Sequence, residues 1–99
     1  WFLANYKNIT RMEFKKLVKG FEVEDDNGKK IGKVDFNIND GLMRITHTEV
    51  DAEYKGKGIA KELVRTAVEY ARHKGLKIKP LCSAAAYILR SEEYKDILE

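Results

Sequence analysis

Two glycines and three lysines alternate in one short stretch, Lys55-Gly56-Lys57-Gly58 followed by Ile59-Ala60-Lys61. The patterns on either side predict a strand before this stretch and a helix after it. Amide N–H groups at a helix start have no partners within the helix, the helix dipole adds positive charge there, and glycines let a ligand approach the backbone closely. The stretch lacks the usual capping residue, and its lysines stand where acids are preferred. These residue types predict a phosphate-like anion site; the alternative is a solvated lysine cluster.

Three side chains near this loop have proton-transfer or nucleophilic chemistry. Histidine as a residue type exchanges protons near neutral pH, so His47 is a candidate general base, and Glu49 in the same expected strand is a second candidate. The alternatives are a histidine packed on the sheet beside Ile45 and a solvated strand-end charge. Cys82 falls between an expected strand and an expected helix start, which can lower the pKa of a thiol; the alternative is a small buried hydrophobe. Two histidines and one cysteine lack the spacing of metal ligands, so no metal site is predicted.

Alternating apolar residues predict an antiparallel meander before the loop. The expected strands lie within residues 14–24, 33–38 and 42–50, of which the first range holds two. In the last strand Met43, Ile45 and His47 are expected on one face. Asn27-Gly28 predicts a type I′ turn between two of the strands.

After the loop, residues 59–74 carry the clearest helical pattern, with an apolar stripe that includes Val64, Ala67 and Ala71. Gly75 stands where a helix usually ends. Residues 76–81 predict a short strand, and Ser83 is expected to cap a short helix that runs to about Arg90. The order β-β-β-β-α-β-α predicts an α+β fold, with a mostly antiparallel sheet and one parallel pair made by a right-handed crossover.

The 99 residues predict one small domain, residues 12–99, with a net charge of +3. Residues 1–11 fit poorly with it and are expected to be an upstream or artificially added extension; the alternative is an extra strand or helix on the sheet. Interspersed charges favour a small anionic ligand over a nucleic acid. The sequence has no apolar run of membrane-spanning length, so no membrane partner is predicted. One cysteine favours a reducing, cytoplasmic compartment. No oligomeric state is predicted.

Comparison with the glycine-loop motifs of known phosphate-binding families narrows the class of anion that this loop could bind. The G-x-x-x-x-G-K-[ST] loop of mononucleotide binders is absent, and a dinucleotide loop would need a third glycine where Lys61 stands. The stretch from Lys55 to Ala60 resembles the Gln/Arg-x-x-Gly-x-Gly/Ala signature of the GNAT superfamily of acetyl-CoA-dependent N-acetyltransferases, with lysine at the first position. His47-Thr48-Glu49-Val50, Leu81-Cys82-Ser83 and Glu92-Glu93-Tyr94 resemble motifs of a short single-domain branch. The resemblance covers the chain from about Met12 to the C-terminus, with Ala84 where that branch often has an aromatic.

The resemblance implies acetyl-CoA as co-substrate and an unidentified primary amine, on a small molecule or a peptide, as acceptor. It implies that the backbone of Glu49 and Val50 holds the pantetheine, that His47 or Glu49 is the general base, and that Tyr87 protonates the departing thiolate. It also allows an acetyl-thioester on Cys82. The implied coenzyme-binding residues are Val50, Lys55, Gly56, Lys57, Gly58, Ile59, Ala60, Lys61 and Ser83. The alternative is a catalytically idle domain that binds coenzyme A or an acyl-CoA, or an interaction domain.

Overall fold

The computed structural model describes residues 2–6 and 9–99, with side chains from residue 13 onward. In this part of the chain six strands form one sheet in the order β1-β2-β3-β4-β5-β6. The strands are β1 (Phe2–Tyr6), β2 (Ile9–Leu17), β3 (Gly20–Glu24), β4 (Lys30–Asn39), β5 (Leu42–Val50) and β6 (Lys77–Pro80). Neighbouring strands are antiparallel except β5 and β6, which are parallel. The predicted α+β class with one parallel pair is confirmed.

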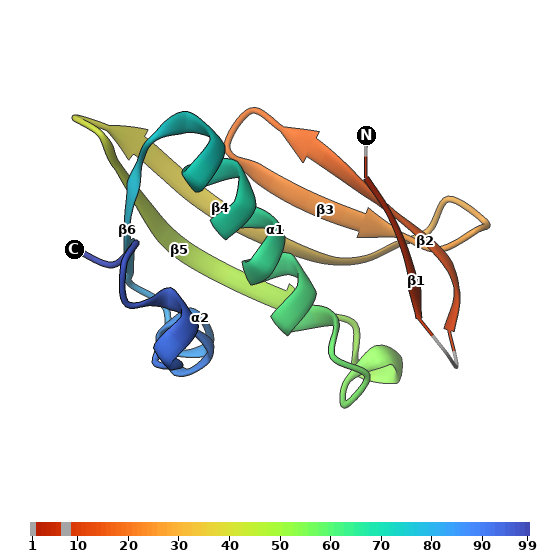
Figure 1. The fold of residues 1–99 in the computed structure, drawn as a ribbon. Helices are drawn as coiled ribbons and strands as arrows, with labels where there is room; N and C mark the ends of the chain where they lie inside the picture. Colours follow the sequence, from red (N-terminus) through yellow and green to blue (C-terminus); the bar gives the residue numbers. More distant parts are fainter. Residues whose placement is uncertain (1, 7–8) are drawn as a thin grey trace.

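Helix α1 (Ile59–Lys74) makes the crossover from β5 to β6 and lies across one face of the sheet (Figure 1). Helix α2 (Ser83–Leu89) follows β6, and two short 3-10 helices, η1 (Ala52–Tyr54) and η2 (Glu92–Tyr94), complete the described elements. No helix in the described residues is long and apolar enough to cross a membrane.

The N-terminal segment supplies one strand more than the predicted order contains. β1 pairs antiparallel with β2 at the edge of the sheet, which agrees with the alternative of an extra strand. β2 begins at Ile9 and runs past Met12, so the expected domain boundary falls inside a strand. The origin of residues 1–11 stays a prediction.

The turn between β3 and β4 differs from the predicted type I′ turn. A type I′ turn needs positive φ at both central residues, but of the pair Asn27-Gly28 only Gly28 has it, with φ 80°. The Asp25 carboxylate explains the difference, because it accepts hydrogen bonds from the backbone N–H groups of Asn27 and Lys29, at 2.9 and 3.0 Å. These side-chain hydrogen bonds to the backbone stabilise the turn.

The core lies between α1 and the face of the sheet that we call the helix face, the side of Val34 and Phe36. The predicted helical stripe is confirmed, since Val64, Ala67 and Ala71 are fully buried. Gly32 on β4 lets the helix come close, because a Cβ there would stand 3.2 Å from a methyl group of Leu63. The opposite face, which we call the polar face, carries the intervening polar side chains of β4 and β5.

Candidate active site

The predicted glycine loop joins η1 to α1 and leaves the helix start uncapped. Gly56 and Gly58 have φ of 79° and 80°, in the left-handed region that strongly favours glycine. Gly58 is the N-cap residue of α1 and provides no side-chain cap. Intrahelical bonding begins with the N–H of Glu62, which donates to the carbonyl oxygen of Gly58 at 3.1 Å. The three amides before Glu62 therefore have no partner inside the helix, and the loop can bind an anion.

A cleft of about 370 Å³ opens beside this helix start. Its lining contains all the predicted coenzyme-binding residues except Lys57 and Ser83. The lining residues are Thr48, Glu49, Val50, Tyr54, Lys55, Gly56, Gly58, Ile59, Ala60 and Lys61. The fold thus joins the end of β5 to the start of α1 in one concave site with two lysines and a backbone rich in free amides.

Two lining residues, Thr48 and Tyr54, were not among the predicted site residues. Tyr54 is half-buried, and desolvation, with the charge of Asp25 next, raises the pKa of its phenol above the ordinary value. Its phenol therefore stays neutral well past physiological pH. An aromatic residue four positions before Gly58 was the only signal that the sequence offered for it.

The end of β5, which lines the cleft, lies beyond the part of the strand that pairs with β6. The two strands pair only from Leu42 to Ile45, and the last link is the N–H of Leu81, which donates to the carbonyl oxygen of Ile45 at 2.8 Å. β5 then runs on to Val50, while the chain after β6 turns away into α2 (Figure 1). Along residues 46–50 the edge of β5 that faces β6 therefore pairs with no strand in the described part of the chain. A ligand that carries amide groups could bond to this edge.

A β-bulge interrupts β5 at the beginning of this free edge. Asp35 pairs with His47, but the next residue, Phe36, pairs with Ile45, so Thr46 is an extra residue. One extra residue reverses the alternation of side chains between the two faces. Ile45 is fully buried, whereas the side chain of His47 is 55% exposed.

The expectation that Met43, Ile45 and His47 share one face is therefore wrong for His47. The bulge moves this side chain to the polar face and brings Thr48 to the helix face, opposite Val34. Period-two reasoning could not anticipate the change, because nothing in the residue types of this strand marks an inserted residue.

On the polar face His47 belongs to a cluster of four charged or titratable side chains. The Nε2 atom of His47 lies 3.9 Å from a carboxylate oxygen of Glu49. The ammonium of Lys33 lies 3.7 Å from Glu49 and 3.3 Å from Asp35. The hydrogen bond to Asp35 is the main cause that raises the pKa of Lys33. Glu49 can thus orient the imidazole of His47, and Lys33 stays charged beside them.

Cys82 lies on the helix side of the same strand end. Its Sγ atom accepts a hydrogen bond from the N–H of Ala85 at 3.4 Å and so caps α2, and it lies 3.5 Å from the hydroxyl oxygen of Thr48. Cys82 lies at a helix start, as the sequence predicted. The structure adds that it lies beside Thr48. Cys82 is not brought together with His47, because His47 lies beside Glu49 and pairs with Asp35 on the opposite face of the sheet.

Tyr87 is 65% exposed, and its ring is stacked with the guanidinium of Arg90, whose Cζ atom is 4.1 Å from the ring centroid. It lines a second cavity, of about 540 Å³, that shares Lys61 with the cleft. Tyr94 also lines this cavity, and its buried hydroxyl has no hydrogen-bond partner in the described residues. The predicted acid thus lies toward the second cavity, beyond the lining of the cleft.

Comparison with known proteins agrees with this arrangement. The model of the GCN5-related N-acetyltransferase family matches residues 20–97. Human N-acetyltransferase 8B is 32% identical over an alignment of 95 residues, which covers 76% of this chain and 42% of the relative. The chain therefore spans about two fifths of the length of that relative.

Solved structures show the same fold. A GCN5-like protein from Staphylococcus aureus, solved by NMR, has 31% identity and a TM-score of 0.72, and the match covers 88% of this chain and 87% of that one. A GNAT family N-acetyltransferase from Escherichia coli, solved in complex with CoA, has 24% identity and a TM-score of 0.62, with 80% of this chain and 46% of that one covered. Since the family match extends over well more than half of the chain, the protein belongs to the GCN5-related N-acetyltransferase family.

Proposed function

We propose that this protein transfers the acetyl group of acetyl-CoA to a primary amine. The observation that carries the proposal is the meeting, in one cleft, of an uncapped helix start and the unpaired edge of β5. The uncapped helix start can donate hydrogen bonds to a pyrophosphate. The unpaired edge of β5 can pair with the two amides of a pantetheine arm. A mononucleotide or an inorganic anion would use only the helix start.

In the proposed complex the pyrophosphate accepts hydrogen bonds from the amides of residues 59–61, and Lys55 and Lys61 add positive charge at the rim. The pantetheine arm runs along residues 46–50, and the backbone of Glu49 and Val50 polarises the thioester carbonyl. The Escherichia coli relative, which has this fold and was solved with CoA, supports the choice of ligand.

The reaction needs a neutral amine, and an alkyl amine with a pKa near 10.4 is charged at neutral pH. His47 is the proposed base, directly or through water, because it lies exposed on the polar face with Glu49 beside its Nε2 atom. The amine nitrogen then attacks the carbonyl carbon, the C–S bond breaks, and an amide and coenzyme A result. Glu49 is the alternative base.

Cys82 offers a second route, in which its thiolate takes the acetyl group before the amine does. The N–H of Ala85 would stabilise that thiolate. Tyr87 was the predicted proton donor to the departing thiolate, but its place at the second cavity favours solvent as the donor. We also propose a cytoplasmic location, where a single cysteine stays reduced and acetyl-CoA is available.

A thermal shift with coenzyme A, acetyl-CoA and NAD, followed by thiol release with a panel of amines, tests the proposal. We expect stabilisation by both coenzyme A forms but not by NAD, and amine-dependent thiol release. Absence of a shift with either coenzyme A form would refute it.

The second candidate function is a coenzyme A-binding domain without transferase activity. Two observations favour it: His47 and Cys82 lie on opposite faces of β5, and Tyr87 lies outside the cleft lining. It predicts the same thermal shifts with no thiol release for any amine.

A further inference from the structure

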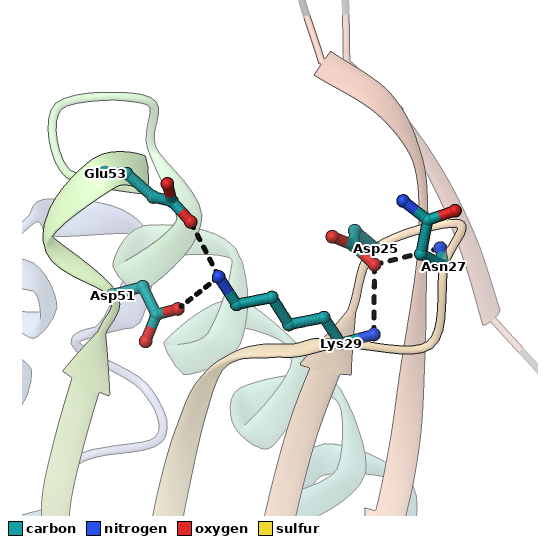
Figure 2. Close-up of polar contacts among 5 residues, drawn as sticks. All are labelled: Asp25, Asn27, Lys29, Asp51 and Glu53. Atoms are coloured by element: carbon teal, nitrogen blue, oxygen red, sulfur yellow. Dashed lines mark hydrogen bonds and ion pairs between the residues drawn. The ribbon is translucent and has the colours of Figure 1, made fainter.

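One lysine ties the β3–β4 turn to the segment that leads into the glycine loop. The ammonium of Lys29 lies 2.7 Å from a carboxylate oxygen of Glu53 and 3.7 Å from one of Asp51. Figure 2 shows the side chain reaching across from the turn to both acids. Two segments more than twenty residues apart in the sequence are thus joined by a single cation.

The backbone of Lys29 is itself held firmly. Its N–H donates to the Asp25 carboxylate at 3.0 Å (Figure 2). Its carbonyl oxygen accepts from the N–H of Asp25, also at 3.0 Å. The segment that carries the two acids is joined to β4 by a backbone hydrogen bond, in which the N–H of Asp51 donates to the carbonyl oxygen of Ile31 at 2.8 Å. The Lys29 side chain therefore extends from a hydrogen-bonded backbone toward a segment whose first residue, Asp51, is also held by a backbone hydrogen bond.

Beyond that segment the loop has few restraints of its own. The last backbone bond before the glycines is from the N–H of Lys55 to the carbonyl oxygen of Ala52, at 3.3 Å, and Gly58 has no side-chain cap. Gly56 and Gly58 are the residue type with the greatest backbone freedom. The direction in which the loop leaves η1 therefore depends on how η1 is held.

Charge gives Lys29 a second effect. Asp51 and Glu53 immediately precede the lysines of the loop, and unpaired carboxylates there would repel a phosphate or pair with Lys55. The hydrogen bond to Glu53 raises the pKa of Lys29, so its ammonium is charged at neutral pH and offsets one of the two negative charges.

We propose that Lys29 is a positioning residue for the coenzyme phosphate site: it fixes η1 before the glycine loop and offsets part of the negative charge of the two acids that it pairs with. The inference rests on the proposed function, since it concerns affinity for acetyl-CoA. Lys29 is not among the residues that line the cleft, and its ion pairs are with Asp51 and Glu53, so we expect it to act on binding and not on the reacting atoms.

The first experiment compares K29M with K30M in steady-state kinetics. Lys30 is the matched control because it is exposed, carries the same charge and makes no ion pair in the described residues. Exposed ion pairs are each worth a factor of about 1.4 to 5. For K29M we expect a KM for acetyl-CoA about three- to tenfold higher and a kcat within about twofold of wild type, with K30M unchanged. Equal effects of the two variants, or a loss confined to kcat, would overturn the proposal.

A charge swap distinguishes the positioning role of the Lys29–Glu53 ion pair from a general electrostatic effect of these charges on an anionic ligand. K29E and E53K should each raise the KM for acetyl-CoA, and the double variant K29E/E53K should return most of the way to wild type. If the acids mattered only as charges near an anion, E53K would lower the KM, and that result would refute the positioning role.

Hydrogen exchange of ligand-free protein keeps this inference distinguishable from the proposed function. We expect the amides of residues 52–58 to exchange several-fold faster in K29M than in wild type and K30M. A wild-type protein that binds no coenzyme A would defeat the proposed function, yet unchanged exchange in K29M would separately defeat the positioning role.

Discussion

Replacement of Gly58 by alanine tests whether the start of α1 holds the coenzyme phosphates. A Cβ at this position meets no atom within 4 Å, so the substitution creates no clash and acts only through the backbone, at φ 80°. Forcing an L-residue into this region costs about 1–2 kcal/mol, partly offset by the reduced freedom of the unfolded chain. We expect a loss of about 1 kcal/mol in the free energy of unfolding, equivalent to about 4–8 °C in melting temperature.

The same strain should alter coenzyme affinity if the loop backbone makes the phosphate contacts. A hydrogen bond to a charged group is worth about 1.5–3 kcal/mol, so misplacement of one amide should raise the Kd for coenzyme A at least about tenfold. Calorimetry at 25 °C, where the variant is still folded, measures this Kd, and thermal unfolding measures the stability.

Gly75→Ala is the matched control at the other end of the same helix. Gly75 has φ 71°, an equally open surrounding and no place in the cleft. We expect the same loss of stability with a Kd within about twofold of wild type. If Gly75→Ala weakened coenzyme binding as much as Gly58→Ala, or if Gly58→Ala left the Kd unchanged, the reasoning that assigns the phosphates to this helix start would be refuted.

Four further predictions concern other parts of the molecule. Tyr94→Phe removes a buried hydroxyl without a partner in the described residues and should raise the free energy of unfolding by about 1 kcal/mol; a lower melting temperature would show that the hydroxyl has a partner. Intact-protein mass after mixing with acetyl-CoA should show a 42 Da adduct (about the mass of one acetyl group) in wild type but not in Cys82→Ala, and its absence in both would exclude the covalent route. The pKa of Lys33 is raised above 10.5 in the folded state, so the stability that it contributes is present below that pH and is lost as the pH rises through the raised value. Lys33→Met should therefore differ most from wild type in urea unfolding at neutral pH and least above the raised pKa of Lys33. Deletion of residues 1–11 should change the melting temperature little if they are an added extension, and a large loss would show that they are part of the folded sheet.

Local chemistry explains why much of this fold could be predicted. The stripe that includes Val64, Ala67 and Ala71 repeats at helical spacing and packs on the sheet, so the sequence pattern predicts both the helix and its buried face. Gly58 and Gly75 mark the two ends of that helix by a property that no other residue type shares so well, free access to positive φ. The proposed coenzyme loop was predictable for the same reason: the contacts proposed for it come from the backbone, and the backbone follows from the element boundaries.

The active-site side chains were less predictable because they depend on strand pairing. Whether His47 faces the core or the polar face is decided by one inserted residue in β5, and the insertion is visible only in its register with β4. Lys57 and Ser83 were predicted because they belong to the glycine-loop signature and to the Leu81-Cys82-Ser83 motif, but residues of one motif need not line one cavity, and neither residue lines the cleft. Lys29 had no local signal at all, since its partners come more than twenty residues later.

The bulge in β5 also bears on how so short a chain could hold two substrates. Before Thr46 the strand is an ordinary core strand, with Ile45 buried under the helices. After it, Thr48 contacts Cys82 on the helix face, while His47 and Glu49 stand on the polar face. The free edge of β5 lies between these two sets, so a thioester held along it would be accessible from both sides. Under the proposed function the coenzyme enters from the helix face, where the α1 start lies, and the amine enters from the polar face, where the base lies. The sheet itself then separates the two substrates, and no additional domain is needed to keep them apart.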